Sequence, residues 1–150
     1  MGSEFLSLIY NKALDILSRR EHSVHELKLK LHKKFEAISE IEEVITKLES
    51  NNLLNDFRFA ETYARIRKRK GFGPNKIYHE LTNKGIKESI SDEIISAEDS
   101  WEDAALKAFR KKYKDGISEN TKERLKQKNF LHNRGFSFKE IESVFSKDML

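Results

Sequence analysis

Apolar side chains recur along this chain at intervals of three and four residues, with charged side chains between them. This spacing is typical of amphipathic α-helices, each of which buries one apolar face. The expected inward faces are Ile9, Ala13, Ile16 and Leu17; Val24, Leu27 and Leu31; Ile41, Val44, Ile45 and Leu48; Phe59, Ala60, Tyr63 and Ile66; Ile77 and Leu81; Ile90, Ile94 and Ile95; Phe109 and Tyr113; Leu125 and Leu131; Ile141, Val144 and Phe145. One proline and six glycines in 150 residues also favour helices.

The same pattern returns about every 50 residues. Leu31, Leu81 and Leu131 fall in register, and a basic residue follows each of them. Self-similarity at a fixed period is typical of stacked repeats, which present long binding surfaces more often than enclosed catalytic pockets. The pattern therefore predicts an all-α fold of three tandem three-helix repeats that form an elongated curved array, with the repeats at residues 6–54, 55–99 and 100–150.

Polar residues mark the expected starts of several helices. Three serine–glutamate pairs have the spacing of a capping box, in which each side chain accepts a hydrogen bond from the other residue's backbone. These pairs are Ser23 with Glu26, Ser39 with Glu42, and Ser137 with Glu140. Asp56 and Thr121 are expected to cap the helices that follow them.

A basic residue followed by glycine ends the second helix in two of the repeats. The pairs are Lys84-Gly85 and Arg134-Gly135, and glycine there is expected to adopt the left-handed conformation that closes a helix. The first repeat has Lys34-Phe35 instead. We therefore expect a differently shaped turn in that repeat.

The composition excludes several kinds of protein. There is no cysteine, which rules out disulfides, thiolate metal sites and cysteine nucleophiles. No apolar run approaches the roughly 18 residues of a membrane span, and the N-terminus lacks the pattern of a signal peptide. We therefore expect a cytoplasmic protein that does not enter membranes. The net charge of +4 is modest, so its distribution matters more than its size.

Two basic groups are the candidate sites for binding the phosphates of DNA or an acidic protein groove. The first contains Arg58, Arg65, Arg67, Lys68, Arg69 and Lys70. Only Glu61 opposes it, and Arg58, Arg65, Lys68 and Arg69 share one helical face that could bind phosphates. The alternative is a solvated face on which Glu61 pairs with Arg65. The second group contains Lys107, Arg110, Lys111, Lys112 and Lys114, with acids just upstream of it.

Between these groups, residues 88–103 carry seven acids and no basic residue. An acidic segment beside basic ones predicts a polarised surface that docks in one orientation. The acids are spread too loosely for a convincing metal site. The five histidines are scattered and expected at the surface, and Trp101, Phe109 and Tyr113 are expected in the core rather than as platforms for bases.

No motif predicts catalysis. Gly71-Phe72-Gly73 lacks the lysine and the preceding strand of a phosphate-binding loop, and no serine has a recognisable base beside it. We therefore predict neither a cofactor nor an enzyme.

Four stretches, taken in order, resemble the RecX family of bacterial regulators of the RecA recombinase: residues 13–27, 53–60, 71–86 and 130–136. The family fold is three tandem three-helix repeats, in agreement with the periodicity. The resemblance implies binding along a RecA–DNA filament and inhibition of the recombinase, ATPase and coprotease activities of RecA, with effects on DNA repair and the SOS response. It also implies binding to single- and double-stranded DNA without strong sequence preference, by a monomer.

A sequence-reading DNA-binding protein is the alternative, because three-helix units with a sharp break resemble helix-turn-helix units. A recognition helix needs Arg, Asn or Gln aimed at base edges. The expected third helices of the first two repeats, residues 39–48 and 89–97, are acidic instead. This charge disfavours their insertion into a major groove.

Overall fold

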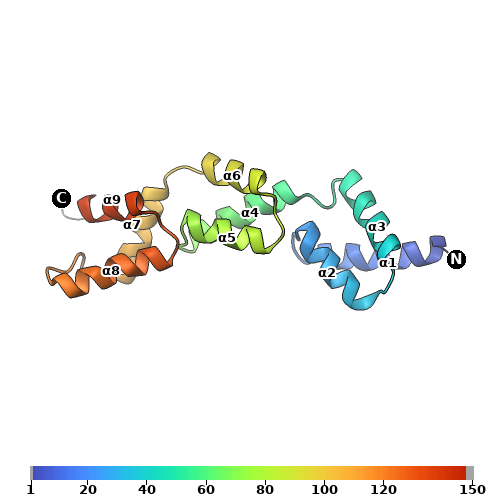
Figure 1. Ribbon diagram of the computed structural model, residues 1–150, viewed down its shortest axis with the longest axis horizontal. Coiled ribbons are helices and arrows are strands. Elements are labelled where there is room, and N and C mark those ends of the chain that lie inside the picture. Colours follow the sequence, from blue (N-terminus) through green and yellow to red (C-terminus); the bar gives the residue numbers. More distant parts are fainter. Residues whose placement is uncertain (1, 148–150) are drawn as a thin grey trace.

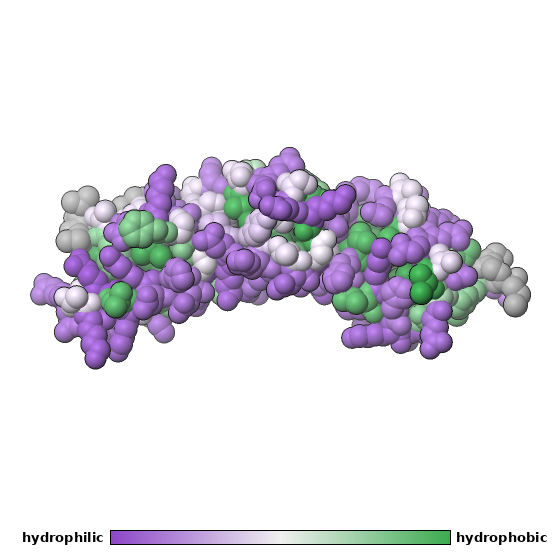
Figure 2. Space-filling view, in the orientation of Figure 1, coloured by the Kyte–Doolittle hydropathy of each residue, from purple (hydrophilic) through white to green (hydrophobic). Residues whose placement is uncertain are grey.

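The computed structural model describes residues 2–147, and all regular structure in that range is α-helical. The helices are α1 (Gly2–Leu17), α2 (Val24–Lys34), α3 (Ile38–Ser50), α4 (Asp56–Arg69), α5 (Pro74–Asn83), α6 (Glu88–Ala97), α7 (Trp101–Lys112), α8 (Thr121–Asn133) and α9 (Phe138–Lys147). They form three triplets, α1–α3, α4–α6 and α7–α9, that follow one another in an elongated, gently arched array (Figures 1 and 2). The predicted fold class is confirmed. Below, these triplets are called repeats 1, 2 and 3.

Each repeat has a small hydrophobic core of its own. Ile9, Leu27 and Ile41 belong to the first core, Phe59, Ile77 and Leu81 to the second, and Phe109, Leu131 and Val144 to the third. Polar residues cover most of the face seen in Figure 2.

Two residues that were expected in the core are exposed instead. Ile66 is 42% exposed and Leu125 is 58% exposed. In α4, Phe59, Tyr63 and Arg67 follow one another at four-residue intervals, and the Arg67 guanidinium, rather than Ile66, lies over the Phe72 ring at 3.8 Å. In α8, the buried positions are Gln127 and Leu131, so Leu125 lies off the inward face.

The capping predictions are confirmed in two cases and wrong in three. Ser23 and Glu26, and likewise Ser137 and Glu140, exchange the two hydrogen bonds of a capping box. By contrast, α3 begins before Ser39, with Ala37 at its N-cap, so Ser39 is already helical and does not cap it.

Asparagines one position earlier replace the other two expected caps. The side chains of Asn55 and Asn120 accept hydrogen bonds from the backbone N–H groups of Arg58 and Glu123. Asp56 is thereby left to accept a hydrogen bond of 2.8 Å from the backbone N–H of Val24 in repeat 1. Its carboxylate links two repeats instead of capping a helix.

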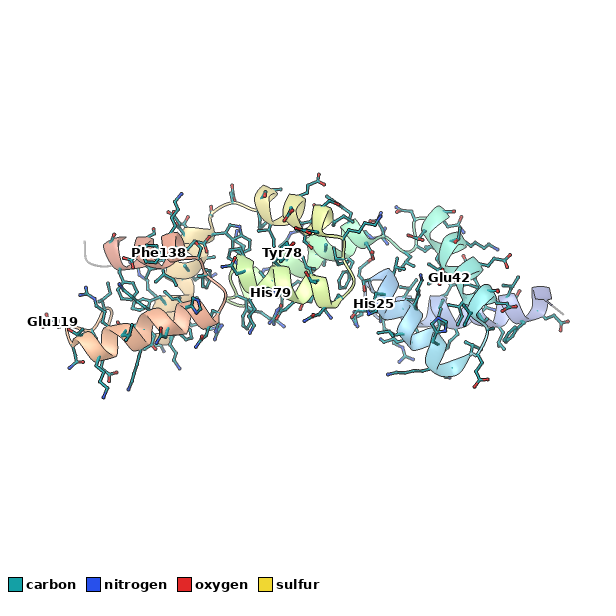
Figure 3. All side chains as sticks on the ribbon, viewed as in Figure 1. His25, Glu42, Tyr78, His79, Glu119 and Phe138 are labelled. Atoms are coloured by element: carbon teal, nitrogen blue, oxygen red, sulfur yellow. The ribbon has the colours of Figure 1, made fainter. Side chains whose placement is uncertain are left out.

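The glycines at the ends of α5 and α8 lie where consecutive repeats meet. Gly85 and Gly135 have positive φ angles of 77° and 96°. A Cβ on Gly85 would come within 2.5 Å of the His25 Cβ, and one on Gly135 within 2.4 Å of the Lys76 Cβ. His25 lies where repeat 1 faces repeat 2 (Figure 3). In both cases the start of a second helix packs against the glycine that ends the second helix of the next repeat.

This arrangement explains why the first repeat departs from the pattern. Phe35 occupies the position equivalent to Gly85, but no earlier repeat approaches it within the described chain. It has an extended backbone with φ −130° and packs against the first core and the Phe5 ring, 6.0 Å away between centroids. A large side chain is tolerated there because it packs against the residues of its own repeat.

The joint between repeats 1 and 2 centres on Glu26. Its carboxylate binds Arg20 at 3.2 Å and Lys84 of repeat 2 at 3.1 Å, in addition to the Ser23 N–H. Burial acts to raise the pKa of Glu26, but hydrogen bonds from Arg20, Ser23 and Lys84 outweigh it and lower the pKa to about 2. The ionised carboxylate therefore stabilises the folded chain.

Glu26→Gln is expected to lower the free energy of unfolding at pH 7 by on the order of 2–3 kcal/mol. Because folding lowers the pKa of Glu26, its contribution is complete above about pH 4.5 and is lost as the pH falls toward about 2. The variant should therefore lose less stability than the wild type over that range. Urea unfolding at pH 7, 4 and 2.5 measures this difference.

The control for this experiment is Glu42→Gln, which removes the half-exposed partner of Lys28 (Figure 3). Exposed pairs contribute about 0–1 kcal/mol, so it should remain close to the wild type. Equal losses in the two variants would contradict the role assigned to Glu26.

Candidate nucleic-acid interface

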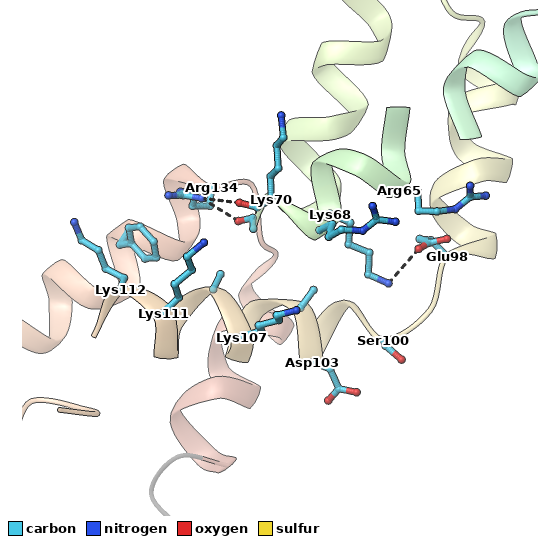
Figure 4. A pocket seen from close by; sticks show the side chains of 15 residues that line it. Arg65, Lys68, Lys70, Glu98, Ser100, Asp103, Lys107, Lys111, Lys112 and Arg134 are labelled. Atoms are coloured by element: carbon cyan, nitrogen blue, oxygen red, sulfur yellow. Dashed lines mark hydrogen bonds and ion pairs between the residues drawn. The ribbon is translucent and has the colours of Figure 1, made fainter. Parts of the chain in front are cut away.

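A groove of about 690 Å³ lies between repeats 2 and 3 (Figure 4). The last turns of α4 form one wall and α7 forms the other, with Phe130 and Arg134 from the end of α8 closing one end. We call this the interrepeat groove.

The lining of the interrepeat groove is strongly basic. Its eight basic residues are Arg65, Lys68, Arg69, Lys70, Lys107, Lys111, Lys112 and Arg134, and its two acidic residues are Glu98 and Asp103. The structure thus brings together members of both basic groups predicted from the sequence, although about 40 residues separate them in the chain. Neither wall alone would hold so high a density of positive charge.

The backbone of the joint fixes the position of the two walls. The Gly73 N–H donates to the Arg134 carbonyl at 2.7 Å, and the Asn75 N–H donates to the Gly135 carbonyl at 2.9 Å. A Cβ on Gly73 would lie 2.5 Å from the backbone carbon of Gly135, so only glycine permits this approach. The groove is therefore defined by hydrogen bonds between repeats rather than by a shared apolar core.

Some of the lining cations are held by internal contacts. Lys68 is only 16% exposed in its side chain, and its ammonium binds the Glu98 carboxylate at 3.3 Å and the Asp99 carbonyl. It also lies 5.0 Å from the centre of the Trp101 ring. Arg65 lies 3.9 Å from Glu61, but both side chains are about half exposed and the pair is weak.

Arg134 is a lining residue that the sequence reasoning assigned only to a helix end. Its guanidinium lies over the Phe72 and Phe130 rings, at 4.7 and 4.9 Å, and reaches the Lys70 and Gly71 carbonyls at 3.4 Å. The signal in the sequence was a basic residue in register with Lys84. That register does not reveal that Arg134 lines the groove, because several of the groups it contacts belong to repeat 2.

Five of the lining cations are available to a ligand. They are exposed and form no ion pair with another residue in the described part of the chain: Arg69, Lys70, Lys107, Lys111 and Lys112. Lysine ammonium groups and arginine guanidinium groups both bind phosphate oxygens, the latter in a bidentate geometry. The arrangement is suited to binding consecutive phosphates.

The structure places the other predicted basic residues outside the interrepeat groove. Arg58 binds Glu21 at 3.1 Å at the joint between repeats 1 and 2, so it does not extend the face formed by Arg65, Lys68 and Arg69. Arg67 binds Glu80 through two hydrogen bonds, of 2.9 and 2.8 Å. Arg110 and Lys114 are exposed but do not line the groove.

Arg67 and Glu80 form a small network with Tyr63. Burial acts to raise the pKa of Glu80, but its hydrogen bonds with Arg67 and Tyr63 outweigh this and lower it. Burial, together with the hydrogen bond to Glu80, raises the pKa of Tyr63 to about 12. The network holds α4 against α5, and the Arg67 guanidinium is engaged by Glu80 and by the Phe72 ring.

The acidic segment is partly used within the fold. Glu98 holds Lys68, and Glu102 accepts a hydrogen bond of 3.2 Å from the Ser143 hydroxyl. Among the described residues, no three His, Asp or Glu side chains come together as metal ligands. None of the helices in that part of the chain is both long and apolar enough to span a bilayer.

The other side-chain predictions have mixed outcomes. Phe109 is fully buried, while Trp101 and Tyr113 pack at the edges of the second and third cores, as expected of core aromatics. His22, expected at the surface, is 2% exposed. It is buried because its two ring nitrogens have partners within repeat 1, the Arg20 carbonyl and the Lys30 ammonium.

Comparison with known proteins places the whole array in one family. Models of the first, second and third three-helix domains of RecX match residues 10–48, 55–95 and 98–145. A regulatory protein RecX from Legionella pneumophila (strain Corby) is 36% identical over 139 residues, covering 92% of this chain and 93% of its own. One from Vibrio parahaemolyticus is 36% identical over 135 residues, covering 89% and 87%.

Solved structures agree with the sequence matches. The crystal structure of RecX from Lactobacillus salivarius superposes with a TM-score of 0.83 at 25% identity and covers 99% of both chains. The order of the three domain models, their extent and the similarity to the relatives all agree. The chain therefore belongs to the RecX family of regulatory proteins.

Proposed function

We propose that this protein binds the RecA–DNA filament and inhibits the recombinase, ATPase and coprotease activities of RecA, thereby modulating DNA repair and the SOS response. It acts in the cytoplasm as a monomer, by binding rather than by catalysis and without a cofactor. Membership of the RecX family supports the partner. The observation that carries the mode of binding is the convergence of eight basic side chains in the interrepeat groove.

The groove is suited to the sugar–phosphate backbone rather than to particular bases. Most of its polar lining residues are cations on or beside the first helices of repeats 2 and 3, and phosphate contacts carry no direct sequence information. We therefore propose that it binds single- and double-stranded DNA without strong sequence preference. An elongated array bearing such a groove can lie along a filament and contact DNA and protein together.

The sequence-reading alternative has less support. The third helices of repeats 1 and 2, α3 and α6, carry mainly acidic charges and do not line the groove. A sequence reader retains its target in the presence of excess random DNA, whereas a phosphate-binding regulator is displaced. Competition with random duplex DNA separates the two classes.

The purified protein is expected to suppress RecA ATP turnover on single-stranded DNA when present well below the RecA concentration. One molecule lodged in a polymer affects many subunits, so inhibition should be substoichiometric. A coupled ATPase assay and a strand-exchange assay on the same samples measure this effect. Unchanged turnover and strand exchange at stoichiometric or higher amounts would overturn the proposed function.

A further inference from the structure

A second basic hollow, of about 480 Å³, lies on repeat 1, away from the interrepeat groove. Its cations are Lys12, Arg19, Arg20, Lys30, Lys33 and Lys34, and no acidic residue is among its lining. They come from the end of α1, the turn that follows it, and α2. We call this the repeat-1 basic site.

A buried histidine organises this site. Nδ1 of His22 lies 3.0 Å from the Arg20 carbonyl, to which it must donate, so Nε2 is an acceptor and lies 2.7 Å from the Lys30 ammonium. Burial lowers the pKa of His22, and the charges of Arg20 and Lys30 add to this effect, which keeps the ring neutral. The neutral ring holds Lys30 in place and leaves its other N–H groups available.

Internal ion pairs account for only part of the charge at this site. Lys12 and Arg19 share Asp15 at 3.7 and 3.4 Å, and Arg20 binds Glu26. Lys30, Lys33 and Lys34 are exposed and form no ion pair with the described residues. Basic residues in the last turn of a helix interact favourably with the helix dipole. This interaction explains the positions of Lys33 and Lys34 but not that of Lys30. The helix dipole therefore does not explain why cations from both α1 and α2 line the same hollow.

We propose that the repeat-1 basic site binds the phosphodiester backbone of nucleic acid independently of the interrepeat groove, so that one molecule holds two separate stretches of backbone. Ile16 is the only apolar residue in the lining and no carbocyclic aromatic ring is present for base stacking, so recognition is electrostatic and independent of sequence. The identification of this nucleic acid as the DNA of a recombination filament rests on the proposed function. The binding of two separate stretches of backbone does not depend on it.

The test is the number of short oligonucleotides bound by one protein molecule, measured by native mass spectrometry at low salt without RecA. An oligothymidylate of about eight nucleotides is long enough to occupy one site. Three variants carry the same change in net charge. The repeat-1 variant is Lys30→Glu, Lys33→Glu and Lys34→Glu; the groove variant is Arg69→Glu, Lys107→Glu and Lys111→Glu; and the control variant is Lys122→Glu, Lys126→Glu and Lys139→Glu, at exposed positions lining neither site.

Two oligonucleotides are expected on the wild type and on the control variant, and one on the repeat-1 variant. If the wild type binds only one, or the repeat-1 variant still binds two, the proposal is overturned. Retention of one oligonucleotide by the repeat-1 variant, combined with its loss in a variant that joins both sets of changes, supports it. If circular dichroism shows that a variant has lost helix, the same positions are changed to glutamine instead of glutamate and the measurement is repeated.

The outcome is distinguishable from failure of the proposed function. Oligonucleotide binding is measured without RecA, whereas the proposed function is tested by RecA turnover. An acidic protein ligand at this site would leave the oligonucleotide count of the repeat-1 variant equal to that of the wild type, which would also overturn the proposal.

Discussion

Replacing Gly135 by alanine is expected to separate repeat 3 from repeat 2 and to lower the free energy of unfolding by about 2–4 kcal/mol. Alanine must adopt a φ of +96° there, and its Cβ would meet the Lys76 Cβ at 2.4 Å and the Lys76 backbone nitrogen at 2.5 Å. The chain can relieve this overlap only by moving α5 away from the end of α8. Such a movement breaks the hydrogen bonds from Gly73 and Asn75 that close the joint.

Urea unfolding measures the loss, and solution scattering measures the change in shape. The matched control is Gly116→Ala, because Gly116 also has a positive φ, of 83°, but lies between α7 and α8 within one repeat. Gly116→Ala should lose about 1–2 kcal/mol, the cost of a left-handed backbone conformation for alanine, without a change in the shape of the array. If both variants lose the same stability and keep the wild-type scattering curve, the joint assigned to Gly135 is wrong.

The groove variant is expected to bind single-stranded DNA roughly 10- to 100-fold more weakly than the wild type at low salt. Its three changes remove cations from both walls of the interrepeat groove. For single strands each lost phosphate contact lowers the salt slope by about 0.7, so the slope should fall by about two if all three residues contact phosphates. Fluorescence anisotropy with labelled DNA over a range of salt concentrations gives both values.

The same measurement on the control variant separates local contacts from overall charge. It has the same net charge as the groove variant, so long-range attraction falls equally in both. Thermal melts of the two should stay close to that of the wild type, because exposed charges contribute little to stability. If the groove variant retains the wild-type salt slope, the groove is a solvated surface and not a DNA site.

The fold was predictable because it repeats a local pattern. Each stripe of apolar residues specifies one helix, and Gly85 and Gly135 end their helices through a conformation that glycine readily adopts. Exact helix starts were less predictable, because Asn55 and Asp56 are both good caps and only the contact with Val24 decides between them. The repeat boundaries, at 54/55 and 99/100, stay predictions.

The site was predictable in its parts but not in its assembly. Both basic groups are visible in the sequence, yet their meeting depends on backbone hydrogen bonds between Gly73 and Arg134, which have no signature in side-chain type. The same limit applies to Arg58 and Arg67, whose partners Glu21 and Glu80 are distant in the chain. Cations on one helical face look equivalent until tertiary contacts neutralise some of them.

Binding of this protein to preformed filaments of RecA on single-stranded DNA tests whether the interrepeat groove contacts the filament. Labelled wild-type protein, the groove variant and the control variant are each titrated with filaments and followed by anisotropy and co-sedimentation. The wild type and the control variant are expected to bind with similar affinity, and the groove variant roughly tenfold or more weakly. Absence of wild-type binding would show that the protein does not bind RecA filaments, and equal binding by the groove and control variants would show that the interrepeat groove does not contact them.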